Sequence, residues 1–416
     1  MPDKLRDRLD TAAHGFLVAL FFAFPIALGA ANTLMALTLV CWLLAGGYRQ
    51  RWSAIGHNPI TAPALMLYGL ILMGTLYTTA PAGDIWNHVG KYSKLVFALV
   101  FLSLLGEERW RRRCWDAFTL AMLVILASVY ASIWIDLPWS NTHTPGWGID
   151  HHVFGDYITQ NVMVAFFVVL ALNRGLHSVQ RWQRWTWYVL AAMGAISITH
   201  LSGSRTGYLL LAAALLTFTF VAAPRNRRLA MLAMVAVALV VGVLTSQSIT
   251  SRFDLALKEA KNRDADNLSS IGHRLYDYRQ VSRLIEERPL LGWGTGAYHG
   301  QVCRVVEKPE WCQVFNWHPH NQFLFFGVDH GLAGVLLFAF LIVRIAWHAR
   351  AVSRPHGILL AVFAAIFFVD SMFNSPLWSS RENHFFMLVM ALLMAGPPGF
   401  SAQAETRPAK PESISP

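Results

Sequence analysis

Residues 229–246 read LAMLAMVAVALVVGVLTS, without a charged side chain, and they follow the basic run Arg225-Asn226-Arg227-Arg228. A helix that crosses a bilayer needs roughly 17–25 mostly apolar residues. Apolar runs of similar length recur from one end of the chain to the other. This stretch therefore predicts a membrane-spanning helix, and its recurrence predicts a polytopic membrane protein.

The composition points the same way. Of 416 residues, 55% are hydrophobic and 14% are charged, whereas a soluble domain is typically about one-quarter charged. We therefore expect lipid to be the solvent for most of the chain, with membrane lipids as partners. The formal net charge of +10 does not indicate a nucleic-acid partner, because the basic residues lie in short loops between apolar runs, where they set topology.

The apolar runs predict an all-α, polytopic fold of about 12 transmembrane helices. We place nine of them in residues 1–246 and three in residues 319–397, separated by a large loop at 247–318 and followed by a disordered cytoplasmic tail at 398–416. A connection as long as this loop is usually functional. The expected helices are 12–31, 32–47, 60–78, 92–105, 115–135, 158–173, 185–200, 206–223, 229–246, 320–347, 356–374 and 384–396.

Lysine and arginine are distributed unevenly between alternate connecting segments. With the N-terminus in the cytoplasm, twenty of them lie in inner segments, and the short outer segments hold only Lys91, Lys94, Arg205 and Arg381. Short cytoplasmic loops are enriched in Lys and Arg, and long loops are exempt from this rule. The bias predicts a multi-pass protein of a bacterial inner membrane, with both termini cytoplasmic and the 247–318 loop in the periplasm.

Within the large loop, residues 269–288 predict an amphipathic helix, which Ser269 or Ser270 can cap and Pro289 ends. Its apolar positions are Ile271, Leu275, Tyr278, Val281 and Leu284 or Ile285, and its polar side carries Arg274, Arg279, Arg283 and Arg288. The arginines are either solvated side chains of an interfacial helix or part of a lid that faces an anionic substrate. The planar guanidinium group suits phosphate oxygens.

Two further features follow this helix in the loop. Residues 289–296, with the sequence PLLGWGTG, predict a tight turn that glycine permits. Cys303 and Cys312 lie nine positions apart. If the loop is periplasmic, a disulfide between them is reasonable.

The strongest local motif is His318-Pro319-His320-Asn321-Gln322, where the loop enters the tenth helix. A histidine at the outer mouth of a helix bundle exchanges protons near neutral pH, so His320 is a candidate general base. The plainer alternative is a polar cap at a helix start. A metal site would need a third ligand such as His151 or His152 from another outer loop, and we expect no metal because none stands at a typical spacing.

The spacing of His320-Asn321, Gly331 and Gly334 resembles the signature of the O-antigen ligase superfamily. That superfamily includes O-antigen ligases, O-antigen polymerases and bacterial protein O-oligosaccharyltransferases. Residues 202–207, with the sequence SGSRTG, are similar to its second motif, and the Arg274 helix with the turn after it resembles the region before the family histidine. The layout of spans and loop also matches, which implies a GT-C-like glycosyltransferase architecture.

The resemblance implies a hexosyltransferase-type enzyme that moves a glycan from undecaprenyl pyrophosphate to the lipid A core, at the periplasmic face, in lipopolysaccharide biosynthesis. No cofactor is expected, because the donor is already activated. His320 would accept the proton of the attacking hydroxyl, and direct displacement would make the transfer inverting and metal-independent. The residues expected to bind pyrophosphate or substrate are Arg205 and Arg274 first, then Arg279, Arg283 and Arg288, with His318 and Asn321.

Several alternatives stay open at this point. We favour the ligase over the protein glycosyltransferases because the chain is compact, without their additional C-terminal periplasmic domain, whereas a polymerase shares the layout. Arg205 has a simpler interpretation as an interfacial anchor. A secondary transporter is the alternative from another class, because Asp329 and His330 lie inside an expected span. Asp370, near the outer end of the eleventh helix, can pair with an arginine and is expected to be structural.

Overall fold

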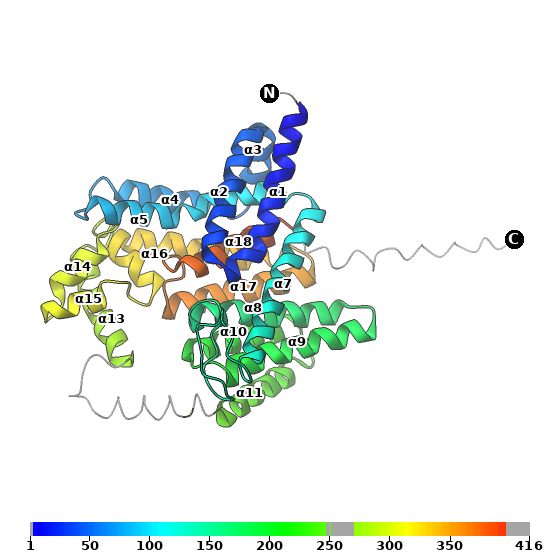
Figure 1. Ribbon diagram of the computed structural model, residues 1–416. Coiled ribbons are helices and arrows are strands. Elements are labelled where there is room, and N and C mark those ends of the chain that lie inside the picture. Colours follow the sequence, from blue (N-terminus) through cyan, green and yellow to red (C-terminus); the bar gives the residue numbers. More distant parts are fainter. Residues whose placement is uncertain (1–2, 247–249, 251–269, 397–416) are drawn as a thin grey trace.

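The chain folds into a bundle of α-helices with a smaller group of helices, α13 to α15, at one side of it (Figure 1). The structure is a computed structural model, and it describes residues 3–246, residue 250 and residues 270–396. These residues form helices, turns and loops and contain no strand. The all-α expectation is confirmed.

The first half of the chain forms α1 (Asp3–Ile26), α2 (Leu28–Ala45), α3 (Tyr48–Gly56), α4 (Thr61–Gly74), α5 (Ala82–Tyr92), α6 (Lys94–Leu104), α7 (Glu108–Ala131), α8 (Tyr157–His177), α9 (Arg181–His200), α10 (Arg205–Ala222) and α11 (Arg228–Thr245). The second half forms α13 (Ser270–Glu287), α14 (Tyr298–Val305), a short 3₁₀ helix η1 (Pro309–Trp311), α15 (Cys312–Phe315), α16 (Gln322–His348), α17 (Arg354–Phe373) and α18 (Ser380–Met394).

Each expected span overlaps one of these helices. Eight helices of the described part are long and apolar enough to cross a membrane, namely α1, α2, α7, α8, α10, α11, α16 and α17. The other expected spans correspond to α4, α6, α9 and α18, of which α4 is a shorter apolar helix. The chain is therefore a multi-pass membrane protein, and a total of twelve spans stays a prediction. The expected tail at 398–416 and the expected cap at Ser269 lie outside the described residues.

The first two helices meet at Ala27 rather than near residue 31, where the sequence placed their boundary. Ala27 has extended backbone angles, φ −131° and ψ 96°, and α2 turns back beside α1 (Figure 1). Both helices are apolar on either side of this turn, so hydropathy does not mark it. The boundary depends on the packing of α2 against α1.

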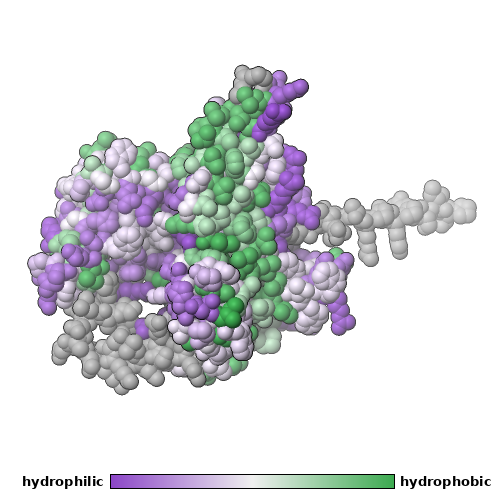
Figure 2. Space-filling view, viewed as in Figure 1, coloured by the Kyte–Doolittle hydropathy of each residue, from purple (hydrophilic) through white to green (hydrophobic). Residues whose placement is uncertain are grey.

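The bundle has a protein-covered centre and a bare edge. Helix α8 is buried along nearly its whole length, because α7, α9, α10, α17 and α18 pack around it. Helix α11 has no buried residue, and it exposes Leu229 (83%) and Leu244 (70%). An apolar helix without protein cover is a lipid-facing element in a membrane protein. Figure 2 shows hydrophobic residues gathered over the side of the bundle that includes α1 and α2, and hydrophilic residues over the region of α13 to α15.

Helix α16 is interrupted in its first half. Gly331 has φ 60° and ψ −156°, which are not helical angles and which residues with a Cβ rarely adopt. The freed backbone groups bond to residues 289–297, which we call the glycine-rich strap. Four backbone hydrogen bonds join the two segments: Leu332 N to Pro289 O (2.7 Å), Ala333 N to Leu290 O (3.2 Å), Trp293 N to Val328 O (2.8 Å) and Gly294 N to Asp329 O (2.8 Å).

The strap approaches its neighbours too closely for side chains at its glycines. A Cβ atom on Gly292 would lie 2.4 Å from Val328 O, and one on Gly331 would lie 2.4 Å from the carbonyl carbon of Leu290. A Cβ on Gly294 would lie 2.6 Å from Thr78, just after α4. The segment expected to be a tight turn is therefore packed between α4 and the break in α16, and its backbone bonds hold the two parts of α16 at that break.

Candidate functional site

His320 lies directly before α16 in an unusual backbone conformation. Its φ is 48°, the only positive value for a non-glycine residue in the described part of the chain. The ring nitrogen Nδ1 of His318 accepts a hydrogen bond from His320 N at 3.1 Å, and the centroids of the two imidazole rings are 4.3 Å apart. The His318 side chain is buried and that of His320 is half-buried. His318 therefore orients His320 through its backbone.

The helix cap is Asn321, not His320. Asn321 Oδ1 accepts from Leu324 N at 3.0 Å, which is the N-cap interaction of α16. Its Nδ2 donates to Met372 O at 3.1 Å, in the last turn of α17. The amide of Asn321 is thus engaged with protein groups, and the plainer interpretation of His320 as a helix cap does not describe this structure.

Tyr278 connects helix α13 to this corner. Its hydroxyl lies 3.2 Å from His320 O and 3.0 Å from Met372 O, and these two carbonyl oxygens are the acceptors for its single hydrogen. Arg274 precedes Tyr278 by one helical turn, so the two side chains share a face of α13. The contact therefore brings Arg274 toward the start of α16.

The positive charge of Arg205 affects the pKa of Arg274. Burial lowers the pKa of the Arg274 guanidinium below its ordinary value, the hydroxyls of Tyr278 and Tyr157 act in the opposite direction, and the positive charge of Arg205 lowers it further. Like charges interact in this way only when they are held near each other. This electrostatic coupling links two arginines that are 69 positions apart in the sequence.

The SGSRTG segment forms the start of α10 and packs against α8. Ser204 Oγ accepts from Gly207 N at 3.0 Å as the N-cap, and Ser202 Oγ accepts from Asn161 Nδ2 at 2.7 Å. A Cβ on Gly207 would lie 2.5 Å from the same Asn161 amide nitrogen. These contacts place the half-buried Arg205 at the first residue of α10, where backbone N–H groups without intrahelical partners favour an anion.

The structure does not bring the other three arginines to this corner. Arg279 and Arg283 are exposed and lie roughly 140° and 180° around α13 from Arg274, and Arg283 Nη1 donates to Gln280 Oε1 at 3.2 Å. The guanidinium of Arg288 lies 4.1 Å from the ring centroid of Trp293 in the strap. Their positions suit solvated or structural side chains.

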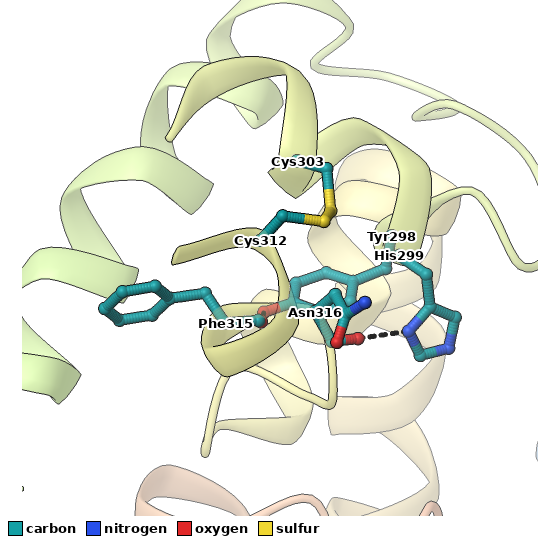
Figure 3. The surroundings of a disulfide bond; sticks show 6 residues. All are labelled: Tyr298, His299, Cys303, Cys312, Phe315 and Asn316. Atoms are coloured by element: carbon teal, nitrogen blue, oxygen red, sulfur yellow. Dashed lines mark hydrogen bonds between the residues drawn. A yellow bond between two sulfur atoms is a disulfide. The ribbon is translucent and has the colours of Figure 1, made fainter. Parts of the chain in front are cut away.

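A disulfide lies beside the segment that carries His318 and His320. It joins Cys303 in α14 to Cys312 at the start of α15 (Figure 3). Two side chains of α14 bond to carbonyls just after the second cysteine: the hydroxyl of Tyr298 donates to Phe315 O at 3.0 Å, and Nδ1 of His299 donates to Asn316 O, the dashed line in Figure 3. Helix α14 therefore holds the approach to the histidines.

Asp329 and His330, which suggested a transporter, lie buried at the break in α16. The Asp329 carboxylate accepts backbone N–H bonds from Tyr298 at 2.9 Å and Gly296 at 3.3 Å, and it lies 3.4 Å from His88 Nε2. Its contacts tie the strap and α14 to α16. A structural role accounts for this carboxylate without a transported solute.

The outer-loop histidines considered for a metal are engaged elsewhere. Within the described residues, no group of three or more His, Cys, Asp or Glu side chains is arranged to hold a metal ion. His151 Nδ1 bonds to Ser132 Oγ at 2.9 Å and its Nε2 to Gly146 O at 2.7 Å, so both ring nitrogens are occupied.

Sequence reasoning did not find Lys91 as a site residue, whereas it gave Asp370 as able to pair with an arginine and expected it to be structural. Lys91 in α5 contacts Trp378 and Trp317, and its only sequence signal was its place in an outer loop. Asp370 is buried beside Glu382, with Asp156 as a further electrostatic neighbour, and no ion pair with an arginine is present among the described residues. Glu382 accepts two bonds from Asn374 Nδ2, at 2.9 and 2.7 Å. Neither carboxyl oxygen of Asp370 has a hydrogen-bond partner within the described residues.

The comparison with protein families selects the same part of the chain. Residues 188–339 match the family model described as O-antigen ligase. The matched span runs from α9 into α16 and includes Arg205, Arg274 and His320. No curated protein matches the chain significantly. Residues 188–339 thus carry an O-antigen ligase domain, which supports membership of this chain in the O-antigen ligase/polymerase superfamily.

Proposed function

We propose that this protein is an O-antigen ligase that transfers a glycan from undecaprenyl pyrophosphate to a sugar of the lipid A core, at the periplasmic face of the bacterial inner membrane. The family match supports an O-antigen ligase/polymerase type of function in lipopolysaccharide biosynthesis. The observation that carries the finer proposal is the contact of Tyr278: it holds the backbone of His320, and its helix places Arg274 in electrostatic reach of Arg205.

The two arginines suit the leaving group. Departure of the lipid pyrophosphate concentrates negative charge, which fixed cations stabilise in a partly desolvated site. Arg205 and Arg274 carry like charges, which repel each other within electrostatic reach. A diphosphate would relieve this repulsion, and each guanidinium can bind two of its oxygens.

His320 suits the acceptor. A sugar hydroxyl is a poor nucleophile until it loses its proton, and a neutral imidazole can accept that proton as the oxygen attacks the anomeric carbon. The bond between that carbon and the pyrophosphate oxygen then breaks, and the electron pair leaves with the phosphate. Attack from the face opposite the leaving group inverts the anomeric configuration. The arginines supply the charge stabilisation, so the proposed transfer uses no metal and no cofactor.

Reconstituted transfer tests the role of His320. Purified protein in liposomes receives an undecaprenyl pyrophosphate glycan and lipid A–core, and transfer is followed by gel mobility. His320→Ala should lower the rate by roughly 10²–10⁴-fold, the usual contribution of a general base. His143→Ala, an exposed histidine of another loop, is the matched control and should retain the rate. Unchanged transfer by the His320 variant would remove it from the base role.

The lipopolysaccharide pattern of a deletion strain separates the ligase from its relatives. A ligase predicts loss of all long-chain bands, with polymer accumulating on the lipid carrier. A core that carries a single repeat unit indicates a polymerase instead. Normal lipopolysaccharide together with loss of glycan from a secreted protein indicates a protein O-oligosaccharyltransferase.

A further inference from the structure

A cationic and aromatic cluster lies beside His318. Lys91, in the last turn of α5, donates from Nζ to Trp378 O at 2.7 Å and lies 3.9 Å from the centroid of that ring. The same Nζ lies 5.7 Å from the ring centroid of Trp317. Asn383 Nδ2 donates to Lys91 O at 2.9 Å, so α18 fixes the end of α5. We call Lys91, Trp317 and Trp378 the lysine–tryptophan cluster.

The ammonium of Lys91 has no acidic partner within the described residues, where the ion pairs involve other side chains. Burial lowers its pKa to about 8, which leaves most of it protonated at neutral pH. Two of its three N–H donors remain after the bond to Trp378 O. A half-buried cation held by two aromatic rings, without a carboxylate, is suited to an anionic group of a ligand.

Trp317 presents an open aromatic face one residue before His318. Its side chain is 60% exposed, although its ring lies 6.0 Å from Trp378 and 6.2 Å from His318. The ring centroids of His318 and His320 lie 4.3 Å apart. The exposed indole thus lies beside His318, whose ring is next to that of the proposed base. An indole face is an apolar platform with a polar edge.

The reaction geometry decides which substrate this cluster can bind. The two sets come from different elements: Arg205 and Arg274 belong to α10 and α13, whereas the lysine–tryptophan cluster comes from α5 and from the segments before α16 and after α17. In a displacement that inverts configuration, the nucleophile and the leaving group lie on opposite faces of the anomeric carbon. If the pyrophosphate lies at the arginines, the separate set of groups beside His318 is suited to the acceptor.

We propose that Lys91 and Trp317 form a binding subsite for the acceptor glycan, in which Trp317 stacks on a sugar ring and Lys91 binds an anionic substituent, either a phosphate or a carboxylate. This inference rests on the proposed function, because it assumes that His320 activates the acceptor hydroxyl. It assigns acceptor recognition to residues other than Arg205 and Arg274, and it predicts that the protein prefers charged acceptors.

Steady-state transfer with defined acceptors tests the subsite. The acceptors are phosphorylated core oligosaccharide, the same oligosaccharide after phosphatase treatment, and an uncharged oligosaccharide carrying one glucuronate. Trp317→Ala should raise the KM for every acceptor about tenfold, with the KM for the undecaprenyl pyrophosphate donor unchanged. Lys91→Gln keeps a donor for Trp378 O and should raise KM about tenfold only for acceptors with an anion, whereas Lys91→Arg should restore binding. The relative effects on the phosphate and glucuronate acceptors identify which anion is recognised.

Two matched variants control for loss of structure. Trp86→Ala removes an exposed tryptophan (71%) from the same helix as Lys91, and Lys308→Gln removes a lysine that lies 5.0 Å from the ring of Trp311 in the same outer region. Both should keep the wild-type KM values. A higher KM for the donor rather than the acceptor, or no change in either variant of the cluster, would overturn the subsite while wild-type transfer stands. If the wild-type protein transfers nothing to any acceptor, the proposed function itself fails.

Discussion

Helices α10 and α16 both begin at the candidate site, and they place their functional side chains by different means. Arg205 is the first residue of α10, held by the cap of Ser204 and by contacts with the adjacent helix α8. His320 precedes α16, and its backbone is held by Tyr278 from 42 positions away and by a helix that is itself broken and tied to the strap. The position of Arg205 is encoded mainly by its own sequence neighbourhood, whereas the position of His320 depends on tertiary contacts.

Apart from removal of the His320 ring itself, the largest expected effect comes from the locally encoded side of this comparison. Arg205→Lys keeps the charge but loses the planar fork, so kcat should fall roughly 10²-fold, the usual cost of one charge-stabilising donor. Arg274→Lys should act similarly. Arg304→Lys, an exposed arginine paired with Glu287 at 2.5 Å, serves as the control. Full activity of both site variants would show that bidentate contact with pyrophosphate is unnecessary.

The break in α16 tests the tertiary side. Gly331→Ala would place a Cβ against Leu290 at a backbone angle that glycine tolerates best, so we expect about 2–4 kcal/mol of destabilisation. The midpoint of thermal unfolding in detergent measures it. Gly300→Ala, with no atom within 4 Å of the added Cβ, should leave the midpoint nearly unchanged. Equal midpoints for the two variants would mean that the strap does not fix α16.

A smaller effect separates the two placements directly. Tyr278→Phe removes the hydroxyl that contacts His320 O and should lower kcat about tenfold, with a loss of about 1 kcal/mol of stability for the hydrogen bond. Ser204→Ala removes the cap of α10 at a similar cost of about 1 kcal/mol. If each helix start controls its own residue, the tyrosine variant changes kcat and the serine variant changes the donor KM. If Tyr278→Phe and Ser204→Ala changed the same kinetic parameter, the two helix starts would not control different residues.

The last prediction concerns stability rather than rate, and it tests how α13 docks. Asp277 in α13 is buried, which raises its pKa to about 8, although a hydrogen bond from the Tyr298 hydroxyl acts in the opposite direction. The folded state therefore holds this proton between about pH 4 and 8 while the unfolded state releases it, and stability should fall as pH rises through that window. Asp277→Asn should flatten the pH dependence of protease resistance in α13. An unchanged slope would show that the carboxyl is ionised in the folded protein.

The sequence predicts those features that depend on nearby residues. The apolar periods predict the long helices, and helix α13 was expected at 269–288 and is observed at Ser270–Glu287. The SGSRTG segment and the His-Asn spacing identify the two helix starts through their resemblance to the superfamily. Local pattern was sufficient here because capping and amphipathicity act over one or two turns.

The remaining features depend on distant contacts. Four arginines on the α13 segment look alike in sequence, but only Arg274 shares the docked face with Tyr278. The cluster of Lys91 with Trp378 joins residues 287 positions apart. The break at Gly331 has meaning only beside the strap, and the turn at Ala27 lies within continuous apolar sequence. Periodicity describes a helix but not its partner, so these positions could not be assigned.

The order of the strap and α16 along the chain has a consequence for biogenesis. During synthesis, residues 289–297 leave the ribosome before Gly331, and helix α4, which contacts Thr295 through Ile71 O and Gly74 O, leaves earlier still. When α16 enters the bilayer, the strap that bonds to its break has therefore already been synthesised. The backbone N–H groups at the break can then form hydrogen bonds at once, and an unpaired N–H group in hydrocarbon would cost free energy. The N-to-C direction of translation thus matches the order in which α4, the strap and the interrupted α16 can be assembled.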